Sequence, residues 1–159
     1  MIKLLCIISL FAASFKPIDY IGQYAKLAQI EQQMYGVPAS LTLAQAILES
    51  GWGKSKGAKL FNNHFGIHCH RRKHYGECVS YIDNGHKVRL LRYNSITASF
   101  RNHSEYLTTG KYADLRTTCG KSYSWCIELE NRGYSQDPLY AEKLQKIIND
   151  YNLEQYDYY

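Results

Sequence analysis

The sequence predicts a mainly helical α+β domain with a small β-hairpin lobe. Helical spacing of apolar residues occurs at both ends of the chain, whereas a strand-like pattern surrounds an Asn-Gly pair near residue 84. No internal repeat, low-complexity linker or long charge block divides the sequence. A single domain over residues 15–159 follows from this organisation.

The first two helices are expected over residues 19–35 and from Pro38 to Gly51. Glycine follows each of them, and proline stands near the start of the second, as is typical of helix ends and helix starts. The second helix carries apolar residues at helical spacing. They are Leu41, Ala44, Ile47 and Leu48.

Further helices are expected over residues 54–60, 97–107 and 124–131. The last helix is expected to begin at Asp137-Pro138, an N-cap followed by proline at the first helical position. Its core-facing stripe is predicted to comprise Leu139, Ala141, Leu144, Ile147 and Ile148.

The β-hairpin is expected over residues 77–92. Val79 and Tyr81 alternate before Asn84-Gly85, and Val88 and Leu90 alternate after it. An Asn-Gly pair between two alternating runs is a strong signal for a two-residue hairpin turn.

The N-terminus has the pattern of a secretory signal peptide over residues 1–14. Lys3 precedes an apolar run over residues 4–13, and small residues surround a plausible cleavage point near Ser14. The run is shorter than the roughly twenty residues that span a bilayer. We therefore expect a periplasmic or secreted protein without stable membrane insertion; an uncleaved N-terminal anchor is the alternative.

Cysteine usage fits an exported chain. Removal of the signal leaves Cys69, Cys78, Cys119 and Cys126, and an even count outside the cytoplasm favours disulfides. Four cysteines allow three pairings. We favour Cys69–Cys78 and Cys119–Cys126 because each pair encloses a short segment.

The charge of the mature chain is modestly positive. Without Lys3, 18 basic residues face 14 acidic ones. This excess favours adsorption to an anionic envelope polymer. It is too small and scattered to indicate nucleic-acid binding, and the cluster over residues 71–73 is typical of a solvated loop.

Glu49 is the leading catalytic candidate. It lies at the end of an apolar helix and is followed at once by Gly51-Trp52-Gly53. Apolar surroundings disfavour an ionised carboxyl and raise its pKa. A glutamic acid that stays protonated near neutrality is the group that a glycosidase uses to protonate a leaving sugar oxygen.

Three segments of the chain resemble bacterial glucosaminidase domains, the mannosyl-glycoprotein endo-β-N-acetylglucosaminidase-like group that includes flagellar and autolysin-type peptidoglycan hydrolases. They read PASLTLAQAILESGWGKSKGAKLFNNHFGI, FRNHSEYL followed by KYADL, and GYSQDPLYAEKLQKIINDYNL. The resemblance covers nearly the whole mature chain. It implies a lysozyme-like fold and cleavage of the bond between N-acetylglucosamine and N-acetylmuramic acid in peptidoglycan.

The second carboxylate is less well defined. The resemblance implies one on the β-lobe, and Asp83, just before the hairpin turn, is the candidate base or electrostatic stabiliser; Glu77 is its rival. Aspartate before Asn-Gly is also common as a turn residue. The residues leave open an inverting route with two carboxylates and a route in which the substrate's own N-acetyl group is the nucleophile.

The resemblance also implies that the helical domain and the small β-hairpin lobe form a substrate cleft, with supporting residues around it. Tyr134 of the GYSQDP motif would assist Glu49. Trp52 is expected to pack against the Glu49 helix and so to help set the environment of the carboxyl. In the NNHFGI segment, Asn62, Asn63, Phe65 and Gly66 are interpreted as cleft-floor residues, with Asn63 as a contact to a sugar amide. We expect no cofactor and a monomer.

The alternatives come from several classes. A lytic transglycosylase also uses one protonated glutamate but forms an anhydro sugar, and a degenerate hydrolase would bind glycan without cutting it. A zinc-dependent peptidase is the weakest alternative, since no H-E-x-x-H or paired C-x-x-C is present and cystine is favoured over thiolate outside the cytoplasm. Its ligands would come from His64, His68, Cys69, His70, His74 and Cys78. We expect no metal site.

Overall fold

The computed structural model describes residues 17–69, 76–83 and 85–158. The signal peptide expected over residues 1–14 and the basic cluster over residues 71–73 lie outside the described residues. Within the described part of the chain, no helix is long and apolar enough to cross a membrane.

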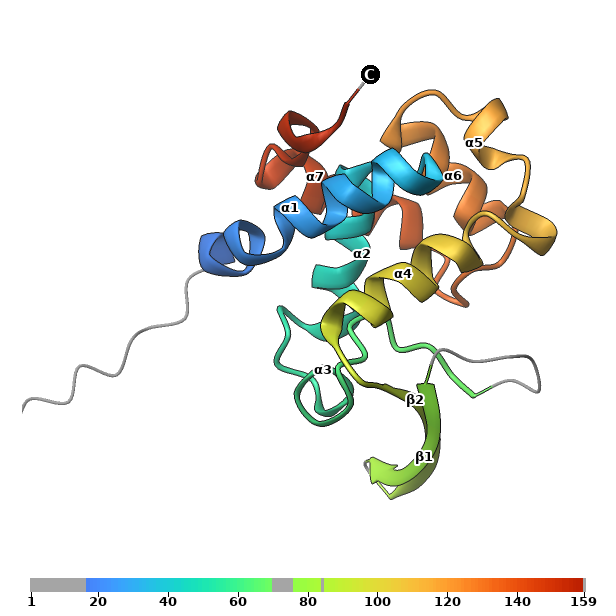
Figure 1. The fold of residues 1–159 in the computed structure, drawn as a ribbon. Coiled ribbons are helices and arrows are strands. Elements are labelled where there is room, and N and C mark those ends of the chain that lie inside the picture. Colours follow the sequence, from blue (N-terminus) through green and yellow to red (C-terminus); the bar gives the residue numbers. More distant parts are fainter. Residues whose placement is uncertain (1–16, 70–75, 84, 159) are drawn as a thin grey trace, which may run out of the picture.

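The architecture is a helical body with a two-stranded antiparallel lobe at one end (Figure 1). The described elements are α1 (Pro17–Tyr35), α2 (Ala39–Ser50), α3 (Lys56–Phe61), β1 (Gly76–Asp83), β2 (His86–Tyr93), α4 (Ile96–Tyr106), η1 (Gly110–Tyr112), α5 (Leu115–Thr118), α6 (Ser122–Asn131), α7 (Tyr140–Asp150) and η2 (Leu153–Tyr156). The expected mainly helical fold with a small β-lobe is confirmed.

Helix α2 is the centre of the helical body. Its residues from Ala39 to Ile47 are all buried, and it packs against α1, α6, α7 and η2. A helix that is apolar on nearly every side is stable only when it is surrounded in this way. Gly51 ends it in the left-handed conformation, with its N–H donating to the carbonyl of Ile47. The expected helix from Pro38 to Gly51 is therefore confirmed.

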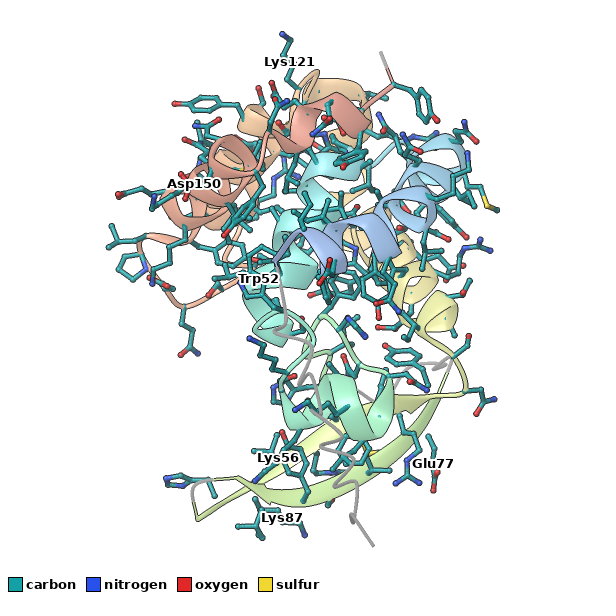
Figure 2. The ribbon with its side chains drawn as sticks, turned by 90° about the vertical axis from the view of Figure 1, so that its left-hand side faces the viewer. Trp52, Lys56, Glu77, Lys87, Lys121 and Asp150 are labelled. Carbon is teal, nitrogen blue, oxygen red and sulfur yellow. A yellow bond between two sulfur atoms is a disulfide. The ribbon has the colours of Figure 1, made fainter. Side chains whose placement is uncertain are left out.

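The β-hairpin projects from the helical body (Figure 2). Asp83 pairs with His86 in the antiparallel register, so the turn contains two residues, and Gly85 has a φ of +80°. The lobe is tied to the segment before it by the Cys69–Cys78 disulfide and by the N–H of Leu91, which donates to the carbonyl of Ile67. The expected hairpin and this disulfide are both confirmed.

The second expected disulfide is wrong. Cys119 and Cys126 are free thiols, and both are buried. Cys126 lies inside α6 with no exposed surface, and Cys119 ends the short helix α5 at the edge of the same core. Each thiol is a small apolar filler of that core, a role that buried free cysteines often have.

The start of the last helix also differs from the prediction. Helix α7 begins at Tyr140, and Asp137 caps the preceding turn by accepting the N–H of Leu139. Leu139 consequently precedes the helix and is 52% exposed instead of joining the core stripe. Ala141, Leu144 and Ile148 are buried as expected.

Cys78→Ser is predicted to loosen the β-lobe while the helical body stays folded. The bond closes a loop of sequence separation 9, for which chain entropy predicts a loss of about 2–3 kcal/mol. Amide hydrogen exchange should accelerate in β1 and β2, with α2 unchanged as the internal control. Equal acceleration in α2 and the hairpin would contradict a local role for the bond.

A buried histidine makes the fold sensitive to acid. His64 is 3% exposed, its Nδ1 lies 2.7 Å from the Tyr20 hydroxyl, and burial lowers its pKa to about 4. A pKa depressed on folding stabilises the native state above the unfolded value near 6.5, and that stability is lost as pH falls towards 4. We predict that His64 alone contributes a loss of about 2–3 kcal/mol over this range, measured as the difference between wild type and His64→Gln in urea unfolding. The buried His103, whose pKa is also lowered by burial, adds a separate loss that is the same in both proteins. The total loss should shrink in His64→Gln and persist when the exposed His86 is changed to Gln.

Candidate active site

Glu49 lies in the last turn of α2, where the chain changes direction sharply. Gly51, Trp52 and Gly53 have φ values of +55°, +62° and +72°, so three successive residues are left-handed. A Cβ at Gly53 would meet Cε2 of Tyr20 at 2.9 Å, which explains the glycine there. The turn ends the helix one residue beyond Glu49. It also holds Trp52, which is not a glycine, in the left-handed conformation, and such strained backbone is often found at functional sites.

The Glu49 carboxyl is half-buried and hydrogen-bonded on one oxygen. The Tyr140 hydroxyl donates to Oε1 at 3.0 Å. Oε2 faces Gly66, where an added Cβ would stand 3.9 Å away. Burial raises the pKa of the Glu49 carboxyl, and the Tyr140 hydrogen bond opposes this only in part. The carboxyl therefore favours its protonated form more than an exposed glutamate does.

A row of hydrogen-bonded polar side chains extends from Tyr140 into the core. Nε2 of Gln45 donates to the Tyr140 hydroxyl at 2.9 Å, and Oε1 of Gln45 lies 2.9 Å from Nε2 of His103. Gln45 and His103 are completely buried. Sequence reasoning missed these three residues, since fifteen tyrosines offer no local signal that would single out Tyr140. The available signal was Gln45, a polar residue one turn before Glu49 in a helix that is otherwise largely apolar.

Tyr134 lies beside this row of polar side chains, as the motif suggested. Its ring stacks on Tyr140 with centroids 5.5 Å apart at 23°, and the rings of Tyr106 and Tyr112 surround it. Burial, and then the nearby Glu49 carboxylate, raises the pKa of the Tyr134 hydroxyl. Tyr134 and Glu49 are thus close enough to interact electrostatically.

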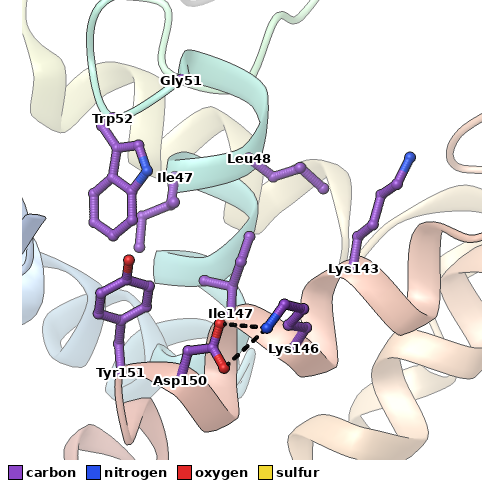
Figure 3. Close-up of a pocket in the computed structure, with 9 residues that line it drawn as sticks. All are labelled: Ile47, Leu48, Gly51, Trp52, Lys143, Lys146, Ile147, Asp150 and Tyr151. Carbon is purple, nitrogen blue, oxygen red and sulfur yellow. Dashed lines mark hydrogen bonds and ion pairs between the residues drawn. The ribbon is translucent and has the colours of Figure 1, made fainter.

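Trp52 lies against the end of the Glu49 helix, as expected, beside Ile47, Leu48 and Gly51 (Figure 3). Its ring meets Tyr151 edge-on at 4.8 Å, over a hollow of about 350 Å³ between α2 and α7. The hollow is lined by Ile47, Leu48, Gly51, Trp52, Lys143, Lys146, Ile147, Asp150 and Tyr151. Glu49 is not among these residues, so Trp52 supports the end of α2 from the side of Tyr151.

The NNHFGI segment builds the wall beside Glu49. Nδ2 of Asn63 donates to the carbonyls of Ile67 and Leu91, and Oδ1 accepts the N–H of Ile67. This amide is engaged in joining the loop to β2, which corrects the expected sugar contact. Phe65 is buried and stacks on the His103 ring at 3.9 Å, while Gly66, with a φ of +62°, lies beside Glu49.

The two candidates for the second carboxylate lie at opposite ends of the hairpin. Asp83 is the last residue of β1, next to the turn. Glu77 lies at the other end of β1, where it forms an exposed ion pair with Arg92 at 3.4 Å. The structure does not bring Glu77 into contact with Glu49, and Glu77 has a structural partner of its own.

The histidine and cysteine run does not converge in the described part of the chain. Cys69 and Cys78 are joined to each other, and His64 bonds to Tyr20. Among the described residues no three His, Cys, Asp or Glu side chains lie together as metal ligands would.

The helical body with a two-stranded lobe, and with a half-buried carboxyl at the end of its central helix, has the fold of lysozyme-like glycoside hydrolase domains. The family model described as mannosyl-glycoprotein endo-beta-N-acetylglucosaminidase matches residues 25–153. The chain belongs to this glucosaminidase family.

Curated relatives share this domain within longer proteins. The chain is 30% identical over 149 residues to the exo-glucosaminidase LytG of Bacillus subtilis, covering 87% of this chain and 52% of that protein. It is 34% identical over 158 residues to an autolysin of Enterococcus faecalis, covering 89% of this chain and 21% of that protein. The chain thus spans about half or less of the length of these two relatives.

Solved structures show the same fold. The glycoside hydrolase domain of FlgJ from Salmonella typhimurium superposes with a TM-score of 0.73 at 26% identity, covering 89% of this chain and 91% of that one. The catalytic domain of the autolysin Auto from Listeria monocytogenes gives a TM-score of 0.72 at 27% identity, with 92% of each chain covered.

Proposed function

We propose that this protein is an exported peptidoglycan hydrolase, an endo-β-N-acetylglucosaminidase that cleaves the bond between N-acetylglucosamine and N-acetylmuramic acid. The observation that carries the proposal is the Glu49 carboxyl. It is half-buried, bonded by Tyr140 and biased towards its protonated form. The family of the chain and the names of its relatives, which include a glucosaminidase and autolysins, support the substrate.

Glu49 acts as the general acid in this proposal. The protonated carboxyl gives its proton to the glycosidic oxygen as the bond to the anomeric carbon breaks, and the leaving sugar departs as a neutral alcohol. The carboxylate that remains accepts the Tyr140 hydrogen bond, which is stronger towards an ion than towards a neutral acid. Tyr140 therefore stabilises the product state of the proton transfer.

Water completes the hydrolysis at the anomeric carbon. Asp83 at the hairpin end is our candidate for the base or the electrostatic stabiliser. Tyr134, which stacks on Tyr140, is our candidate for the residue that orients the N-acetyl group or stabilises developing charge. The substrate's N-acetyl group supplies the alternative nucleophile. In Asp83→Asn, an unchanged rate would favour that alternative.

The proposed location is the cell envelope or the extracellular space. The relatives include an autolysin and peptidoglycan hydrolases, and the signal-like residues 1–14 agree with export. The glycan strands of peptidoglycan are the proposed partner.

Identification of the product ends tests the function. Purified peptidoglycan is digested, the fragments are reduced with borohydride, and the terminal sugar is read by mass spectrometry. Fragments that end in reduced N-acetylglucosamine support the proposal, and release of single terminal sugars would make the enzyme exo-acting. Anhydro-muramic ends would reassign the chain to the lytic transglycosylases, whereas sedimentation with the wall without cleavage would indicate a binding module.

A further inference from the structure

The side chains behind Glu49 form an unbroken line of three hydrogen bonds with one consistent direction. His103 contacts Gln45, Gln45 contacts Tyr140, and Tyr140 contacts Glu49, at 2.9, 2.9 and 3.0 Å. The four residues come from α4, α2, α7 and again α2. Each of the three contacts joins residues that are far apart in the sequence, whereas Gln45 and Glu49 themselves lie one turn apart on α2.

The donor and acceptor of each of these hydrogen bonds can be assigned by starting from His103. This ring has no exposed surface and stacks on Phe65, and burial lowers its pKa to about 3, so the imidazole is neutral. Nδ1 has no hydrogen-bond partner among the described residues. A buried N–H without an acceptor is rarer than an acceptor without a donor. The ring proton therefore belongs on Nε2, where it is donated to Oε1 of Gln45.

The remaining directions follow from the chemistry of each group. An amide whose oxygen faces His103 presents its NH₂ to Tyr140 and can only donate there. The Tyr140 oxygen accepts that bond, which leaves its single hydrogen for Oε1 of Glu49. In a protonated carboxyl the carbonyl oxygen is the stronger hydrogen-bond acceptor, so the Tyr140 hydrogen bond favours the form with the proton on the other oxygen.

We propose that Gln45 and His103 are positioning residues that lock the Tyr140 hydroxyl as a donor to Oε1 of Glu49, so that the acidic proton resides on Oε2, the oxygen that faces Gly66. This inference rests on the proposed role of Glu49 as the acid. The inference adds that Oε2 of Glu49 is the oxygen that delivers the proton. It also adds that Gln45 and His103, which are too deeply buried to contact the substrate, determine this choice of oxygen.

The direct test is the titration of the Glu49 carboxyl, followed by ¹³C NMR in the full chain and assigned with Glu49→Gln. Tyr140 and Tyr134 are the titratable groups that the described residues bring against Glu49. In Tyr140→Phe the titration midpoint should rise by about one pH unit, since a hydrogen bond to the ionised form is lost. In Gln45→Met it should rise by a smaller amount, because the hydroxyl is free to turn away.

The double variant separates positioning from general repacking. If Gln45 acts through Tyr140, Gln45→Met adds nothing to the midpoint in the Tyr140→Phe background. An equal shift in both backgrounds, or no shift in the single variant, overturns the proposal. The readout needs no substrate, so its outcome is distinct from failure of the proposed glucosaminidase activity.

A second pair of variants keeps the proposal testable if Gln45→Met fails to fold. His103→Gln keeps a donor near the place of Nε2, whereas His103→Met removes it. We expect a wild-type midpoint in His103→Gln and a raised one in His103→Met. The same midpoint in both variants would show that the ring fills space only, and would overturn the assignment of His103.

Discussion

Glu49→Gln is expected to lower the rate of peptidoglycan hydrolysis by about a thousandfold. General acid catalysis contributes about 10²–10⁴ to a rate, and the amide has no proton to give at neutral pH. The amide oxygen can still accept the Tyr140 hydroxyl, so the site should keep its shape. The rate is measured as release of reducing ends from purified peptidoglycan.

Glu142→Gln is the matched control for this substitution. Glu142 is exposed in the first turn of α7, two residues from Tyr140, and the change there is chemically the same. The control should keep the wild-type rate. A Glu49→Gln protein that folds and retains more than about a tenth of the rate would exclude Glu49 as the acid.

The same substitution should raise stability at neutral pH. The pKa of Glu49 is raised in the folded state, so the native protein binds the proton more tightly than the unfolded chain does. The contribution of Glu49 to wild-type stability is then greatest below the ordinary glutamate pKa and falls as pH rises through the raised value. Gln has no such penalty, and its advantage in urea unfolding should disappear near pH 4.

Arg101→Met is predicted to cause the largest loss of stability, about 3–5 kcal/mol in the free energy of unfolding. Glu31 has no exposed surface, and the Arg101 guanidinium holds both of its carboxylate oxygens at 3.0 Å. Removal of Arg101 leaves a charge in the core between α1 and α4 without its partner. The loss is read from urea unfolding at pH 7.

Two further variants define the origin of this loss. Lys146→Met breaks an exposed pair with Asp150 and should cost no more than about 0.5 kcal/mol. A double variant with Glu31→Met and Arg101→Met removes both charges and should recover much of the stability. If the double variant is as unstable as Arg101→Met, packing and not the unpaired charge explains the effect.

Local signals in the sequence predicted the parts of the fold that local physics determines. Pro38 and Gly51 bounded α2 because one fits a helix start and the other adopts the left-handed exit. The Asn-Gly signal predicted the two-residue connection between Asp83 and His86, where Gly85 has a positive φ. The raised pKa of the Glu49 carboxyl was predicted from its place at the end of an apolar helix.

The rest of the site depends on contacts between distant residues. Tyr140 lies 91 positions from Glu49 and 95 from Gln45, and no spacing rule connects such pairs. Trp52 packs against the Glu49 helix as expected, but its contact with Tyr151, 99 positions away, had no local signal either. Tertiary packing decides which residues meet around a helix end.

The pH dependence of kcat/KM tests the central claim that Glu49 acts in its protonated form. The substrate is a soluble peptidoglycan fragment, and stability is monitored at each pH. The account predicts that activity falls as pH rises through a value above the ordinary range of a glutamate carboxyl, since the acid then loses its proton. Activity that stays constant or increases from pH 4 to pH 8 would contradict it.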